Sequence, residues 1–211
     1  MNTSFLSDER VAGGLLVAPI LIALIALVIM IISGAAAGFR PATQGDLERV
    51  APYAGTFDLL ILLFVISWIV HLLGIGLLAR LLARAGAEQL AILASTLILV
   101  TVFSAILKFS FDMTVELWAT QEAAQSGSLP VLYEPLSTWT SRVFRLGYVI
   151  HFVAVIGIGW AILRSGLLSA SLGWATIGWS SLWLVGALVG AGAPAVPLLM
   201  PAAIGVALLL K

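Results

Sequence analysis

The side chains best suited to chemistry in this chain are its two histidines, His71 and His151. Each lies within a long apolar run, where an imidazole is costly unless it has a polar partner. Imidazole is the usual axial ligand of haem iron, and it also binds the magnesium of chlorophylls. We therefore predict that the pair forms a cofactor and metal site for a b-type haem or a chlorophyll-type pigment.

The same two histidines also fit a packing role, in which each imidazole is hydrogen-bonded between helices. His71 lies nine residues before Arg80, whereas His151 lies thirteen residues before Arg164. If these arginines mark one membrane edge, the offset is about 6 Å, and it is about 10 Å when counted from the opposite ends. Two ligands of one iron need nearly equal depth, so this spacing predicts a mismatch and favours packing over a shared haem.

A second group of polar side chains is spaced by four residues: Ser104, Lys108, Asp112 and Glu116. On a helix this spacing places all four on one face and allows Lys108 to pair with Asp112. Such a face is suited to a polar path for protons or ions. It also fits a helix that leaves the bilayer, with a snorkelling lysine beside interfacial carboxylates.

The elements that position these residues follow from composition, because 62% of the 211 residues are apolar and only 9% are charged. Soluble domains are about half apolar and a quarter charged. The sequence therefore predicts an all-α, polytopic transmembrane helical bundle in a single domain, 1–211, surrounded by a lipid bilayer. About six membrane-spanning helices are expected, near 11–33, 57–79, 88–107, 141–163, 167–190 and 194–210.

Two longer connections, Gly34 to Thr56 and Phe109 to Thr140, are expected on the same side of the membrane. The third helix is expected to continue past the membrane, or to bend along its surface, before Gly127 and Pro130 end it. Basic residues in the short loops of the other side place both termini in the cytoplasm.

Several classes of function find no support in the sequence. Ten basic and ten acidic residues balance without a basic cluster, so we expect no nucleic-acid partner. The chain has no cysteine, and two histidines without a buried carboxylate make a poor zinc site. Ser180 and Ser181 follow both histidines, whereas intramembrane serine proteases have the histidine after the serine. We expect a protein that is not an enzyme.

Two short motifs carry a family resemblance: Glu9 to Leu16, and Arg164 to Leu168 leading into Leu172, Gly173 and Trp174. Here the chain resembles a bacterial six-helix integral-membrane family of unknown function. The resemblance implies a six-helix fold and a multi-pass protein of the bacterial inner membrane. It supplies no ligand residues. The placement of the histidines in the second and fourth helices is similar to that of b561-type cytochromes, which use four histidines for two haems.

Three hypotheses about function follow. The first is a non-catalytic subunit or accessory protein of a bacterial membrane assembly, with other membrane subunits as partners and His71 and His151 as a possible haem b or pigment site. The second is a membrane electron carrier with a bis-histidine haem. The third is a small-solute or proton transporter that uses Lys108, Asp112 and Glu116.

Overall fold

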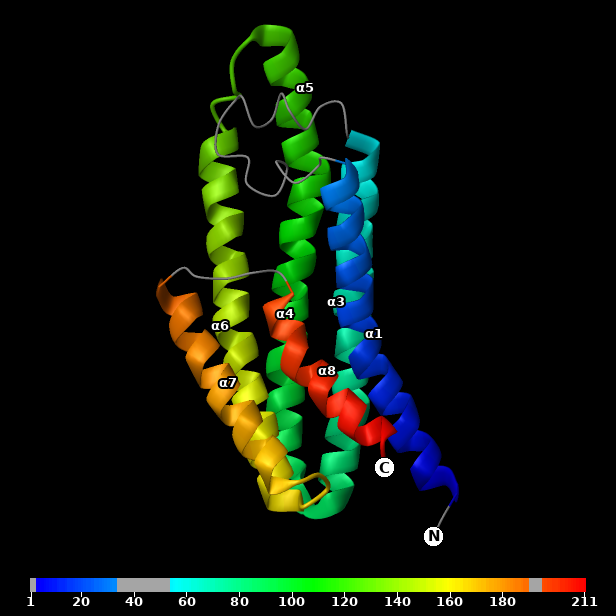
Figure 1. Ribbon diagram of the computed structural model, residues 1–211. Helices are drawn as coiled ribbons and strands as arrows, with labels where there is room; N and C mark the ends of the chain where they lie inside the picture. The colour runs from blue at the N-terminus through cyan, green and yellow to red at the C-terminus, as the bar shows by residue number, and fades with distance from the viewer. Residues whose placement is uncertain (1–2, 34–53, 190–194) are drawn as a thin grey trace.

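The computed structural model describes residues 3–33, 54–189 and 195–211, and no strand occurs in these ranges (Figure 1). The elements are α1 (Thr3–Ser33), α3 (Ala54–Leu82), η3 (Ala83–Ala87), α4 (Glu88–Phe111), η4 (Asp112–Glu116), α5 (Leu117–Ser126), α6 (Tyr133–Ser165), α7 (Ala170–Val189) and α8 (Val196–Leu209). The predicted all-α helical bundle is confirmed.

Four helical stretches are long and apolar enough to cross a membrane: Asp8–Ile32, Gly55–Ala123, Tyr133–Ser165 and Ala170–Val189. The second stretch contains two helices, α3 and α4. The chain reverses direction between them at Gly86, whose positive φ of 95° is a conformation that favours glycine. The last helix, α8, has only 14 residues, or about 21 Å, against a hydrocarbon core of about 30 Å. The chain is thus a helical membrane protein, and six crossings remain a prediction.

Helix bounds differ most from the prediction where helices extend beyond their apolar runs. The helix predicted from 141 begins at Tyr133, whose side chain packs against Phe111 and Ala119. The third helix continues as expected, through η4 and α5, until the left-handed Gly127 ends it. The first helix begins at Thr3, not residue 11, and the last begins at Val196, with residue 194 outside the described ranges. An apolar-run criterion detects only the part of a helix that hydrocarbon surrounds.

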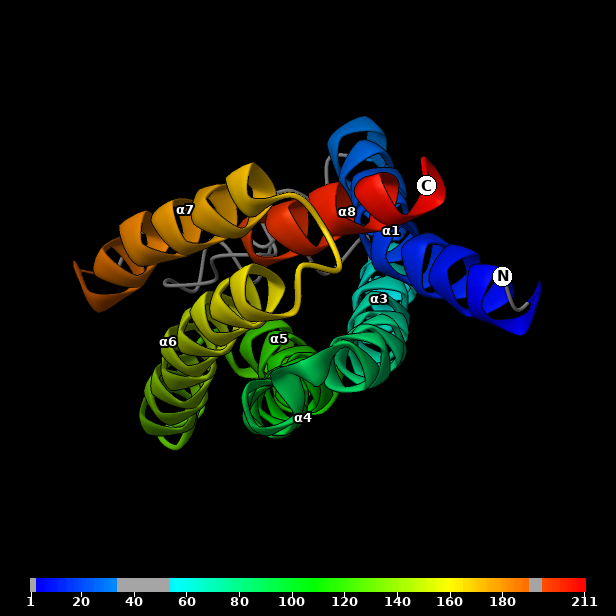
Figure 2. The ribbon, with the colours of Figure 1, turned by 90° about the horizontal axis from the view of Figure 1, so that it is seen from below.

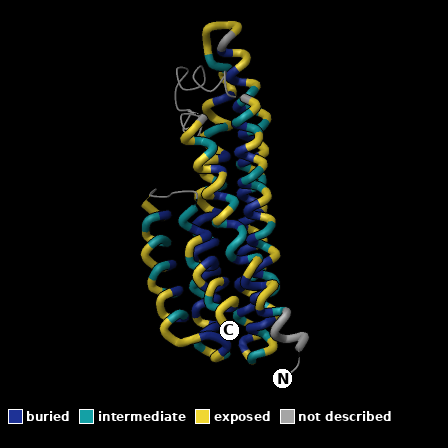
Figure 3. The backbone as a smooth tube through the Cα atoms, turned by 45° about the vertical axis from the view of Figure 1, so that its right-hand side comes forward, coloured by how far each residue is buried: buried dark blue, intermediate teal, exposed yellow. Residues whose placement is uncertain are grey.

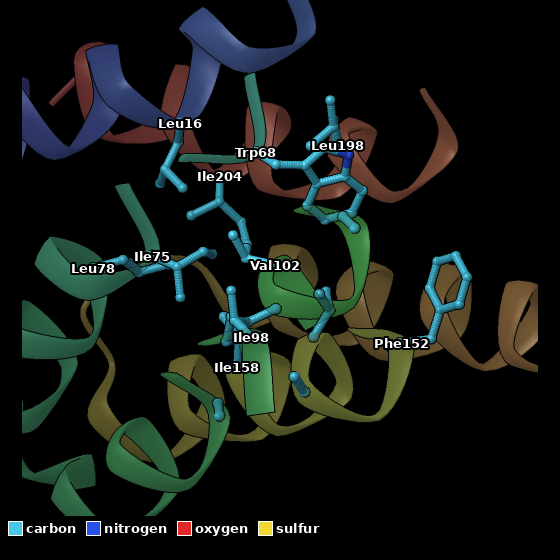
Figure 4. Close-up of a cluster of buried hydrophobic side chains, with 14 of the residues drawn as sticks. Leu16, Trp68, Ile75, Leu78, Ile98, Val102, Phe152, Ile158, Leu198 and Ile204 are labelled. Atoms are coloured by element: carbon cyan, nitrogen blue, oxygen red, sulfur yellow. The ribbon is translucent and has the colours of Figure 1, made fainter. Parts of the chain in front are cut away.

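The helices pack as neighbours around a shared core. In it, α4 contacts α3 and α6, α1 contacts α3 and α8, and α7 lies along α6 (Figure 2). Both termini lie at the end where α3 turns into α4 and α6 into α7 (Figure 1). Buried positions follow the inward faces of the helices (Figure 3). The part of the core drawn in Figure 4 includes Leu16 from α1, Trp68 from α3, Ile98 from α4, Ile158 from α6 and Ile204 from α8.

Pro19 shapes the contact between α1 and α3. Proline has no N–H, so the Leu15 carbonyl receives no hydrogen bond from residue 19. Gly74 of α3 lies against that carbonyl. A Cβ at Gly74 would stand 2.8 Å from the Leu15 oxygen. Ser67 donates a hydrogen bond of 2.9 Å to the carbonyl of Pro19 itself. Ser67 and Gly74 of α3 thus pack against the part of α1 where Pro19 interrupts the helical hydrogen bonds. Helix α1 bends along its length (Figure 1).

Candidate functional site

His71 on α3 and His151 on α6 meet in the core of the bundle. Both are fully buried, and their ring centroids are 5.4 Å apart. Trp68, one turn before His71, stands with its ring centroid 5.7 Å from each imidazole. The predicted depth mismatch is therefore wrong.

The reason is that arginine side chains extend toward water and mark depth poorly. The turns are better markers of depth. Gly86 ends the turn after α3 fifteen residues beyond His71, and Gly166 ends α6 fifteen residues beyond His151. Counted from these glycines, the two histidines lie at equal depth, about 22 Å along each helix.

A proline in α8 determines how His151 is bonded. Pro201 has no N–H, so it cannot donate to the carbonyl of Pro197 four residues earlier. The Nε2 of His151 lies 2.9 Å from that carbonyl oxygen. A carbonyl only accepts, so Nε2 carries the proton and donates it, which leaves Nδ1 of a neutral His151 with a lone pair. Within the described residues, neither this Nδ1 nor either ring nitrogen of His71 has a hydrogen-bond partner.

The two imidazoles as they are packed do not fit a haem between them. A porphyrin held by both rings would extend sideways beyond each of them. Trp68 occupies that space beside both histidines, and the Phe152 ring centroid lies 5.5 Å from that of His151. The Nε2 of His151 is also engaged by Pro197.

A second site lies on the continuous helix formed by α4, η4 and α5. Lys108 pairs with Asp112, and its Nζ lies 3.7 Å from Oε1 of Glu116. The side chains of the three are 18%, 10% and 6% exposed. The Nζ of Lys108 therefore contacts both carboxyl groups. Asp112 and Glu116 begin and end the π-helical turn η4, a feature that often occurs at functional sites. The predicted pairing of Lys108 with Asp112 is confirmed.

The polar face of this helix is longer than the predicted stripe. Thr101 and Thr120 are buried at 1% and 4% exposure and extend the same three-to-four residue spacing at both ends. Thr101 donates to the carbonyl of Gly147 at 3.1 Å, and the Ser104 hydroxyl lies where a Cβ of Gly147 would be. The spacing of these threonines was visible in the sequence, whereas the role of Pro197 depends on a contact between distant helices.

The two sites are separate. Trp68, beside the histidine pair, contacts the ring of Tyr148, which contacts Phe144. Phe144 in turn contacts Phe109, the residue after Lys108. A chain of aromatic rings thus leads from Trp68, beside the imidazoles, to Phe109. The structure brings together the residues of each predicted site, but it does not join one site to the other.

Comparisons with family models, with curated proteins and with solved structures find no match to this chain. The resemblances to the six-helix bacterial family and to b561-type cytochromes therefore stay predictions.

Proposed function

We propose that this chain is a multi-pass membrane protein that carries protons across the bilayer. Lys108, Asp112 and Glu116 are the ionisable groups that take up and release the proton. The observation that carries the proposal is that one partly buried ammonium group is shared by two buried carboxyl groups.

The charges of the cluster support proton uptake. Fully ionised, it holds one positive and two negative charges, and a single proton makes it neutral. Asp112 and Glu116 contact the same Nζ, so their charges repel each other, and a proton on either carboxyl group removes this repulsion. Ionisable residues that face the interior of a membrane bundle commonly mark proton or ion pathways.

The position of the cluster is also consistent with an entry point. Lys108 lies twenty residues after Glu88, or about 30 Å along the helix, which equals the thickness of the hydrocarbon core. The cluster would then lie at the membrane edge farthest from η3. From there the buried hydroxyls of Ser104 and Thr101 continue the polar face toward the interior.

Proton flux into liposomes tests the proposal. The purified chain is reconstituted with a pH-sensitive dye inside, and a potassium gradient with valinomycin drives protons inward. We expect flux above that of empty liposomes, reduced at least about tenfold in Asp112→Asn and in Glu116→Gln. Glu122→Gln is the matched control, because Glu122 is exposed on the same continuous helix. Wild-type flux equal to that of empty liposomes, or unchanged flux in both variants, contradicts the proposal.

The other two hypotheses stay predictions with tests of their own. A stable monomer in mild detergent, without a co-purifying partner, counts against the assembly subunit. An absorption spectrum without a Soret band, after expression with haem supplied, ends the haem electron carrier. The packing of Trp68 and Phe152 beside the histidines already opposes that carrier.

A further inference from the structure

The histidine pair has buried nitrogen atoms that the proton path does not use. Nδ1 and Nε2 of His71 and Nδ1 of His151 are buried, and no hydrogen-bonding group of the described residues reaches them. Buried polar atoms in proteins nearly always have a partner. Three unpartnered ring nitrogens on two adjacent imidazoles therefore indicate a ligand-binding site.

We propose that His71 and His151 together bind one Cu(I) ion. His151 is arranged as a metal-binding histidine usually is: its Nε2–H donates to a backbone carbonyl, that of Pro197, which fixes the ring and leaves Nδ1 free to bind. Two imidazoles that hold one ion at about 2.0 Å from each nitrogen have ring centres roughly 6 Å apart. The observed separation is 5.4 Å, so small side-chain rotations are enough.

The residues around the histidine pair favour an ion of low charge. No group of three or more His, Asp or Glu residues suited to a metal occurs in the described ranges, so the pair has no carboxylate to balance a divalent ion. The cost of burying an ion in a dry core rises steeply with its charge, which favours a monovalent ion.

The ligands select the kind of ion. Sodium and potassium are hard ions that prefer oxygen ligands, as calcium does. Zinc requires about four ligands. Copper binds imidazole well, and in its monovalent state two ligands satisfy it.

A competition titration tests this site without reference to proton transport, so its outcome is independent of the proposed function. The purified full-length chain in detergent, kept reduced with ascorbate, is titrated with Cu(I) against the coloured chelator bicinchoninate. We expect one Cu(I) per chain, and no displacement by Zn(II).

Matched substitutions separate a ligand role from a packing role. Leu and Met have similar volumes, but only Met offers a thioether that binds Cu(I). We expect His71→Leu to lower Cu(I) affinity at least about 100-fold, and His71→Met to keep it within about tenfold of wild type. His151→Leu is expected to behave as His71→Leu does.

Equal Cu(I) affinity in the wild type and both Leu variants would overturn the proposal, as would Zn(II) binding at the same site. If the Leu variants do not fold, X-ray absorption of the Cu(I)-loaded wild type decides. Two nitrogen neighbours at about 2 Å support the site, and any other coordination overturns it. A wild type that takes no Cu(I) from bicinchoninate overturns it as well.

Discussion

At the scale of single residues, the candidate sites depend on small side chains as much as on ionisable ones. Ser104 lies on the polar face of α4, and it has space there because residue 147 on α6 is glycine. The same glycine exposes the carbonyl to which Thr101 donates. Close backbone approach at Gly147 thus gives Thr101 an acceptor on α6 besides the Leu97 carbonyl of its own helix, whereas Ser104 donates to the Thr101 carbonyl.

Gly147→Ala tests this close approach. The new Cβ would stand 1.8 Å from the Ser104 hydroxyl oxygen and 3.0 Å from its Cβ, so the Ser104 side chain must leave its position and its Cβ must move slightly. We expect a loss of about 1–3 kcal/mol in stability, measured as a lower thermal unfolding midpoint in detergent. The double variant with Ser104→Ala should recover part of the loss.

Gly157→Ala is the matched control on the same helix, because its new Cβ would make only an ordinary contact of 3.6 Å with Ala94. Alanine favours helix over glycine, so this variant is expected to be as stable as wild type or slightly more stable. A Gly147→Ala variant with the stability of Gly157→Ala would contradict the packing described for α4 and α6.

At the scale of elements, α8 has only 14 residues, too few to cross the hydrocarbon core, and three contacts with other helices fix its position. Gly205 packs against Gly13 of α1, each glycine lying close to the carbonyl of the other. Lys211 pairs with the buried Glu9 at 3.1 Å. At its start, the Pro197 carbonyl accepts from His151 on α6. Helix α8 therefore connects α1 to the histidine pair.

The glycine contact between α1 and α8 gives a prediction with neighbouring residues as test and control. A Cβ at Gly13 would lie 2.8 Å from the Gly205 oxygen, whereas a Cβ at Gly14 meets nothing within 4 Å. We expect Gly13→Ala to lower stability by about 1–3 kcal/mol, because a backbone atom cannot move aside cheaply. Gly14→Ala should leave the unfolding midpoint unchanged or slightly higher. Equal midpoints for the two variants would show that α8 does not pack on α1 in this way.

The difference between prediction and structure is also clearest at the scale of elements. Apolar runs predict the helices because lipid requires about 20 apolar residues for each crossing. They do not predict the first turns of α6, where Tyr133 is buried against Phe111 and Ala119 while most of the following residues are exposed. The four-residue spacing of Lys108, Asp112 and Glu116 predicts one face, since local geometry fixes it. The bond from His151 to Pro197 joins residues 46 apart, and sequence spacing does not encode it.

At the scale of the whole molecule, the arrangement has two unlike ends. One end holds both termini and the tight turns at Gly86 and Gly166 (Figure 1). At the other end α5 and α6 extend beyond α7 and α8, and the turn at Gly127 lies there (Figure 1). The Lys108 cluster lies toward this extended end. Under the orientation predicted from basic loop residues, the extended end faces away from the cytoplasm, so the proposed proton entry faces outward.

Single cysteines test this topology cleanly, because the natural chain contains none. Ser128 and Ser169 are exposed in turns at opposite ends of the bundle. With a membrane-impermeant maleimide applied to sealed cells, we expect Ser128→Cys to react at once and Ser169→Cys only after permeabilisation.

Val189→Cys, at the exposed end of α7, reports on the last two helices. If the chain crosses six times, it reacts like Ser128→Cys, since the 20 residues of α7 are about 30 Å long. Reaction only after permeabilisation would instead mean that α7 and α8 enter and leave on the same side, which leaves four crossings.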